Sequence, residues 1–153
     1  MSQSGLKVVA HLLGGTLVKG YIQSSHSSDA EAALREQLKS NTKVRLHGEQ
    51  SGDPHEFEIG SLKALFFVKT FEGRGEYKEI KFFQSNPTLE GLWVQLRFDD
   101  GEVTEGILQN SLRYLMEPGF FLKPPDPNSN NEYVFVAKNS LAEFRVLGVR
   151  SKY

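Results

Sequence analysis

Apolar and polar side chains alternate along several short segments of the chain. Val8, Ala10 and Leu12 occupy every second position near the start, and the same spacing recurs over residues 94–98. A strand with one buried face needs this spacing, because successive side chains of a β-strand point to opposite faces. The pattern therefore predicts a mainly β protein.

The chain also aligns with itself at an offset of about 86 residues. Residues 7–23 lie over residues 93–109, and glycines coincide at positions 15 and 101 and at positions 20 and 106. Each copy predicts about five short strands. We therefore expect two tandem small antiparallel β-barrels of the SH3-like or Sm-like type, the first over residues 5–69 and the second over residues 93–149.

Glycines mark the expected turns and bends. A Gly-Gly pair at 14–15 and an Asp-Gly pair at 100–101 predict two-residue hairpin turns, since a type I′ turn needs positive φ at both central positions. Gly20 and Gly106 fall inside strands, where a glycine often marks a bulge, a bend or a close approach of another backbone. These signals favour strands that curl strongly enough to close a small barrel.

Two further segments have predicted structures. Residues 28–39 begin with a capping-box signature and place Ala30, Leu34 and Leu38 on one face, which predicts a short helix inserted in the first barrel. Residues 70–92 connect the two barrels and are rich in aromatic side chains. We therefore expect this connector to pack between the barrels rather than to form a free linker.

Three runs of sequence carry a family resemblance: residues 65–73, the hairpin at residues 99–103, and residues 119–136. Through these runs, nearly the whole chain resembles an uncharacterised bacterial family whose domain is found alone or appended to signalling proteins. The resemblance implies a regulatory or signalling context. It implies no chemistry, because no activity is established for that family. The helical insert at residues 28–39 departs from the more symmetrical members.

Charge and composition narrow the function further. The 153 residues include 18 Lys and Arg against 19 Asp and Glu, so the chain lacks the basic excess of a general nucleic-acid binder. The absence of Cys excludes disulfides, thiol catalysis and cysteine-ligated metal. The longest apolar run covers residues 64–68, and no basic-then-apolar leader opens the sequence. We therefore expect a cytoplasmic protein that does not enter a membrane.

The candidate catalytic and metal sites are weak. His47 and His55 do not have the i, i+4 spacing of a helical zinc site. Residues 126–137 resemble a calcium loop, but the Gly of the sixth position and the Glu of the twelfth are missing. No Gly-x-Ser-x-Gly motif is present, and His11 is expected on the exposed face of its strand. We therefore expect a protein that is not an enzyme and that has no cofactor and no metal.

A protein partner is the function that the residues favour. The predicted partner-binding residues come from two loops of the second barrel: Arg113, Tyr114, Leu115, Met116, Asp126, Asn128 and Asn130. The first loop combines an arginine with large apolar groups, which are enriched at protein interfaces. The second is a dense turn sequence. We predict a protein-protein interaction module that binds an unidentified protein partner and exists as a monomer or homodimer.

Two alternative functions stay open. Small barrels often bind RNA or single-stranded DNA by stacking bases on aromatic side chains, although most aromatics here lie in strand-like stretches where core packing accounts for them. The further alternative is a barrel that senses a nucleotide or cyclic dinucleotide. Arg145 and Arg150 have neither the spacing nor the position of the arginines in such domains, and the Asp/Asn-x-Ser-x-x-Gly motif does not follow them.

Overall fold

The computed structural model describes residues 5–23, 30–39, 42–48, 54–72, 79–87 and 90–150. The first half contains β1 (Gly5–Leu12), β2 (Leu17–Gln23), α1 (Ala30–Leu38), β3 (Lys43–His47), β4 (Pro54–Glu58), the 3₁₀ turn η1 (Ile59–Ser61) and β5 (Leu62–Val68). The second half contains β6 (Gly91–Phe98), β7 (Val103–Leu108), α2 (Arg113–Met116), β8 (Gly119–Lys123), β9 (Asn131–Ala137), the 3₁₀ turn η2 (Lys138–Ser140) and β10 (Leu141–Arg150). The predicted mainly β class is confirmed.

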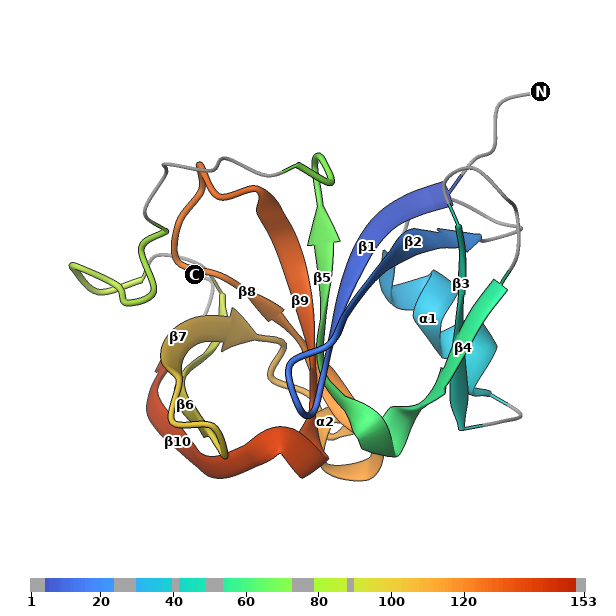
Figure 1. Ribbon diagram of the computed structural model, residues 1–153. Coiled ribbons are helices and arrows are strands. Elements are labelled where there is room, and N and C mark those ends of the chain that lie inside the picture. The colour runs from blue at the N-terminus through green and yellow to red at the C-terminus, as the bar shows by residue number, and fades with distance from the viewer. Residues whose placement is uncertain are drawn as a thin grey trace.

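The ten strands form one antiparallel sheet in the order β10-β6-β7-β8-β9-β5-β1-β2-β3-β4 (Figure 1). Each half contributes five neighbouring strands, and the internal order is the same in both, with the fifth strand beside the first. The halves join where β5 pairs with β9, for example Ala64 with Val136 and Phe67 with Tyr133.

Two separate closed barrels are therefore not confirmed. The second edge of β5 pairs with β9 of the other half instead of closing the sheet of its own half. The sheet consequently stays open, with β4 at one end and β10 at the other. β5 belongs to the first half and β9 to the second, and the two strands pair across the junction. A sequence pattern that describes each half separately does not reveal this pairing.

Two hydrophobic clusters fill the two halves. The first includes Val8, Leu34 and Leu65, together with Phe135 from β9 of the second half. The second is built mainly from β6 to β9 and takes Ala64 from β5 of the first half. Since β5 and β9 each supply a side chain to the opposite cluster, the junction between the halves is buried as well as hydrogen-bonded.

The predicted helix is confirmed as α1. Ala33 and Leu34 are buried, and Ala30 and Leu38 pack partly against the first cluster. The helix contacts β2 and β3. The two residues that begin the capping box, at positions 28 and 29, lie outside the described residues. Among the described residues, neither helix has the length and apolarity that crossing a membrane requires.

Both predicted hairpins form, but with three-residue loops. Phe98 N donates to Glu102 O at 2.8 Å, and Gly101 N donates to Phe98 O at 2.9 Å. Gly101 has φ +94°, whereas the φ of Asp100 is not positive, so the type I′ prediction is wrong here. A turn followed by a glycine of positive φ is the usual geometry of a three-residue hairpin loop. The loop before β2 has the same hydrogen-bond pattern between Leu12 and Thr16.

The strand glycines at positions 20 and 106 mark close approaches, one of the three possibilities that the sequence left open. A Cβ on Gly20 would lie 2.7 Å from the His47 carbonyl oxygen and 2.9 Å from Leu46 Cβ. A Cβ on Gly106 would overlap the side chain of Leu122. In each half the third strand in the sheet, β3 or β8, therefore crosses directly over a glycine of the strand before it.

The connector packs along β7 where residues 79–83 are described. Glu105 N donates to Lys81 O at 2.8 Å. The Glu105 carboxylate, which is buried, accepts one hydrogen bond from Phe83 N and one from the Trp93 indole, each at 3.0 Å. These contacts support the expectation that this segment is not a free linker. Residues 73–78 and 88–89 lie outside the described residues.

Candidate protein-interaction surface

A short helix, α2, occupies part of the segment in which a loop was expected. Leu112, Leu115 and Met116 have the spacing i, i+3, i+4, which places them on one side of a helical turn. Their exposed fractions are 73%, 61% and 84%. We call these three residues, together with the exposed Arg113, the α2 surface. Burying such side chains at an interface is favourable, because it removes apolar area from water.

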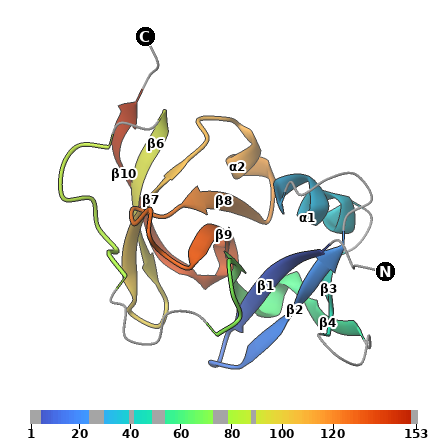
Figure 2. The same ribbon diagram turned by 90° about the horizontal axis from the view of Figure 1, so that it is seen from above.

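The remaining predicted residue of this segment, Tyr114, anchors α2 instead of extending the exposed surface. It is half-buried, and its ring stacks on Phe144 with centroids 6.0 Å apart and planes 11° from parallel. Arg35 of α1 donates to the Glu117 carboxylate at 3.3 Å, just beyond the end of α2. The two helices consequently lie side by side (Figure 2). Three of the four predicted residues are thus presented to solvent by a supported helix.

An apolar groove of about 380 Å³ lies beside α2. Tyr114 and Leu115 form one wall, and the start of β10, including Ala142 and Phe144, forms another. The groove follows from the way α2 packs, because the Tyr114 ring holds the helix against β10 without covering the neighbouring side chains. It gives the second half a concave apolar feature next to the α2 surface.

The other predicted partner loop, residues 124–131, lies at the opposite end of β8 from α2 (Figure 1). The structure therefore does not bring the two predicted segments together into one surface. Asp126 is buried, and its carboxylate accepts hydrogen bonds from Ile80 N at 3.1 Å and Asn128 N at 2.9 Å. Asn130 accepts from Thr70 N at 3.0 Å and donates to Thr70 O at 2.8 Å.

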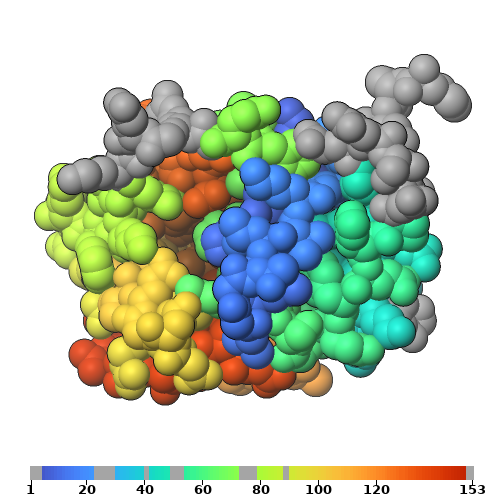
Figure 3. All heavy atoms as spheres, viewed as in Figure 1, coloured from blue at the N-terminus to red at the C-terminus, as the bar shows by residue number. Residues whose placement is uncertain are grey.

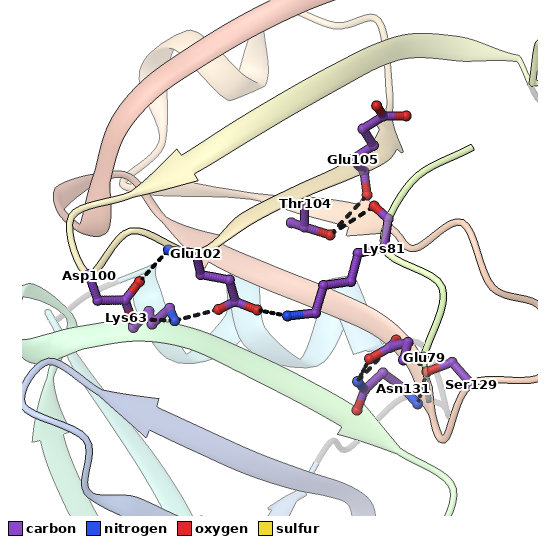
Figure 4. Close-up of polar contacts among 9 residues, drawn as sticks. All are labelled: Lys63, Glu79, Lys81, Asp100, Glu102, Thr104, Glu105, Ser129 and Asn131. Carbon is purple, nitrogen blue, oxygen red and sulfur yellow. Dashed lines mark hydrogen bonds and ion pairs between the residues drawn. The ribbon is translucent and has the colours of Figure 1, made fainter. Parts of the chain in front are cut away.

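These contacts give the 124–131 loop a structural role, which is to hold the start and the middle of the connector. Ser129 also donates to Glu79 at 2.6 Å, and Asn131 donates to the same carboxylate (Figure 4). Turn-forming residues suggested an exposed loop, but here their short polar side chains bond to the main chain of another segment. Partner contact by Asp126, Asn128 and Asn130 stays a prediction, and the geometry favours the α2 surface instead.

A charged cluster links the two halves and the connector near the hairpin loop that follows β6 (Figure 4). Lys63 of β5 bonds Asp100 and Glu102, each at 2.6 Å, and Lys81 bonds Glu102 at 2.7 Å. Burial opposes the charge of Lys63, but the two carboxylates outweigh it and raise the pKa of this amine. The hydrogen bond from Lys63 lowers the pKa of Asp100. Burial would raise the pKa of Glu102, yet Lys63 and Lys81 together lower it.

His11 lies against this cluster and is half-buried, not exposed as the strand pattern predicted. Its ring centroid is 4.3 Å from that of Phe66, which belongs to the neighbouring strand β5. Burial lowers the pKa of His11, and the nearby positive charge of Lys63 lowers it further, against an opposing effect of Glu102. The folded protein thus favours the neutral form of the His11 imidazole over the protonated form.

We expect the free energy of unfolding to fall in two stages as the pH is lowered. Since the unfolded chain protonates His11 more readily than the native state does, stability declines below about pH 6.5. Asp100 and Glu102 stabilise the fold fully above about pH 4.5, and this contribution is lost as the pH falls through their lowered native pKa values. Urea titrations at a series of pH values, followed by Trp93 fluorescence, measure both stages.

The control for the first stage is His11→Phe, which keeps an aromatic ring against Phe66 and does not titrate. It should flatten the stability profile around pH 6.5 and leave the acid stage unchanged. A variant profile that still bends near pH 6.5 would assign that stage to another group.

A larger cleft of about 1010 Å³ lies between the two halves, bounded by strands of both and by α1. The charged side chains on its walls balance in sign: Lys7, Lys123 and Arg150 against Glu31, Glu90 and Glu132. The walls therefore select neither an anionic nor a cationic ligand. Within the described ranges, His, Asp and Glu side chains do not gather in groups of three that could hold a metal ion.

By its fold and surface, this is a mainly β protein with one open ten-stranded antiparallel sheet. It has a short helix with exposed apolar side chains and a charged cluster that joins its two halves. A family model matches residues 4–148, so the chain belongs to a family of unknown function, DUF6982. The comparisons found no similar curated protein and no similar solved structure. Membership of an uncharacterised family agrees with the sequence resemblance.

Proposed function

We propose that this protein is a non-enzymatic adaptor, acting in a bacterial regulatory or signalling context, that binds a partner protein through the α2 surface. The observation that carries the proposal is the exposure of Leu112, Leu115 and Met116 on one side of a helix that Tyr114 and Glu117 hold in place. A fixed apolar surface with an arginine beside it has the composition of an interface centre. The partner accordingly offers an apolar patch with a carboxylate for Arg113.

Buried carboxylates support a binding role over a catalytic one. Glu105 and Asp126 both accept hydrogen bonds from main-chain N–H groups. Carboxylates engaged in this way hold segments together and are not directed at a substrate. The proposal that the protein is not an enzyme rests on this arrangement.

Aromatic burial weakens the case for nucleic-acid binding. Phe67 and Phe120 are buried, so much of the aromatic content predicted from the sequence belongs to the core. Among the described aromatic residues, Phe82 and Tyr133 are the exposed ones, at 44% and 43%. Two exposed rings and a balanced charge do not form the basic, aromatic groove that binding a single strand requires.

The test compares capture of proteins from a lysate of the source organism by the wild-type chain and by the double variant Leu115→Asp/Met116→Asp. The variant should lose a stoichiometric protein partner that the wild type retains after nuclease treatment. The carboxylates make burial of this surface unfavourable. Because both residues are exposed, the free energy of unfolding of the variant should lie within about 0.5 kcal/mol of the wild-type value.

Leu17→Asp is the matched control, since Leu17 is 53% exposed on β2 and lies in the other half. It should bind as the wild type does. Equal capture by wild type and α2 variant would contradict the proposal. Capture that disappears on nuclease treatment would favour the nucleic-acid alternative instead.

A further inference from the structure

The outer edge of β10 is unpaired in the described part of the chain. This strand of ten residues pairs only with β6, and it lies at the outside of the molecule in both ribbon views (Figures 1 and 2). Its atoms line the lower rim of the space-filling view (Figure 3). Val146, Leu147 and Val149 are exposed at 47%, 37% and 58%. A long edge strand with exposed apolar side chains is a ready site for pairing with another strand.

The hydrogen-bond pattern shows which main-chain groups face outward. Phe98 N bonds Glu102 O on the side of β7, so by alternation Arg97 and Gln95 direct their main-chain groups to β10. Their partners on β10 are Glu143 and Arg145. Phe144 lies between these two partners and Val146 follows them. The main-chain N–H and C=O groups of Phe144 and Val146 therefore point to the open edge.

The first half shows how this kind of edge is filled. β5 holds the same place in its half as β10 does in the second, beside the first strand and after a 3₁₀ turn. The second edge of β5 is covered by an antiparallel strand, β9. The fold thus already pairs the edge of β5, whereas the equivalent edge of β10 has no strand partner among the described residues.

The other end of the sheet is a poorer candidate. β4 has five residues, of which His55, Glu56 and Glu58 carry polar or charged side chains, and Pro54 has no N–H to donate. Short, charged edge strands with proline resist pairing. β10 contains no proline, and its charged residues are of both signs. Its pairing with β6 shifts register before Glu143 and after Val146, so the regular part of the strand is Glu143 to Val146.

We propose that two copies of this chain form a homodimer by antiparallel pairing of their β10 strands around a two-fold axis at Phe144. This register places the outward main-chain groups of Phe144 opposite each other. It also places Glu143 of each copy opposite Arg145 of the other, twice in the dimer. Within one chain these two side chains already form an ion pair of 3.4 Å and stay partly exposed.

The same register brings Val146 of the second copy opposite Ala142, which lines the apolar groove beside α2. An exposed valine therefore meets an apolar recess at each end of the paired strands. The pairing is self-complementary in hydrogen bonds, charge and apolar contacts, which a two-fold interface requires. It leaves Leu112, Arg113 and Met116 of the α2 surface free for the partner that the proposed function assigns, whereas Leu115 borders the groove that Val146 meets.

Sedimentation of the full chain over a wide range of concentration is the test. The wild type should form a dimer whose dissociation constant is measurable. Glu143→Arg alone places arginines opposite each other at two points and should weaken the dimer roughly tenfold or more, as should Arg145→Glu. The double swap, Glu143→Arg/Arg145→Glu, restores opposite charges and should restore the dimer.

Mixing the two single variants provides the decisive control. In a mixed pair every contact between positions 143 and 145 joins opposite charges, so the mixture should dimerise more tightly than either variant alone. Val146→Pro, which removes one of the outward main-chain N–H groups inferred for the described part of β10, should also abolish the dimer. A wild type that stays monomeric at every concentration would overturn the proposal. So would single reversals without effect, or a dimer lost only in the α2 variant.

Discussion

Gly106→Ala is expected to destabilise the protein by about 3 kcal/mol. The added Cβ would overlap the side chain of Leu122, which is buried and packed in the second cluster. Leu122 cannot move aside easily, because its side chain is packed in the second cluster and its main chain pairs with Leu108 of β7. Chemical denaturation followed by circular dichroism gives the loss of free energy directly.

Gly60→Ala is the matched control for this prediction. Gly60 lies in η1, where the nearest atom to an added Cβ is Asn139 Nδ2 at 3.8 Å, an ordinary contact. Its φ is not positive, so alanine fits without backbone strain. The free energy of unfolding of the control should lie within about 0.5 kcal/mol of the wild-type value. Equal effects at the two positions would show that close packing over Gly106 is not the cause.

Asp126→Ala has the second largest expected effect, a loss of about 2 to 3 kcal/mol. The variant removes the acceptor of the Ile80 and Asn128 main-chain N–H groups inside a buried site. Because Ile80 belongs to the connector, the change should also release that segment from the second half. Hydrogen exchange of the Ile80 and Phe83 amides, measured with the denaturation curve, separates the local effect from the global one.

Asp99→Ala provides the comparison, since Asp99 is an exposed carboxylate of the same half. It should leave both amides as protected as in the wild type. Unchanged protection of Ile80 and Phe83 in Asp126→Ala would show that the connector is held by other contacts. The result bears on function, because it decides whether residues 124–131 are free to bind a partner.

Local sequence signals predicted local structure well. Alternation of apolar residues predicted the strands, and the spacing of Ala30, Leu34 and Leu38 predicted a helix packed on the first cluster. Glycines at 20 and 106 predicted a bulge, a bend or a close approach, and the structure shows close approaches. Each of these features depends on neighbours in sequence or on the face of a single element.

Features that depend on distant pairing were not predictable in the same way. The strand β5 reads as the last strand of a barrel, and nothing local indicates that its second edge pairs with β9. His11 was expected on an exposed face, since nothing near position 11 shows that Phe66 of β5 packs against its ring. Asp126 has the composition of a turn, and its burial follows from the connector that packs over it.

For the candidate site, the sequence located the correct segment but not its geometry. Residue types at positions 113–116 suggested an interface, and the structure adds which of them are exposed. The stacking of Tyr114 on Phe144 requires the second half to be folded, so it has no signature near position 114. The free edge of β10 is likewise a property of the completed sheet.

The shared ladder between β5 and β9 makes the two halves mechanically continuous. A force that pulled the halves apart along the direction of these two strands would load the hydrogen bonds from Ala64 to Val68 together. The halves should therefore transmit tension as a single rigid body. A partner held at α2 would therefore be joined firmly to the first half of the chain as well as to the second.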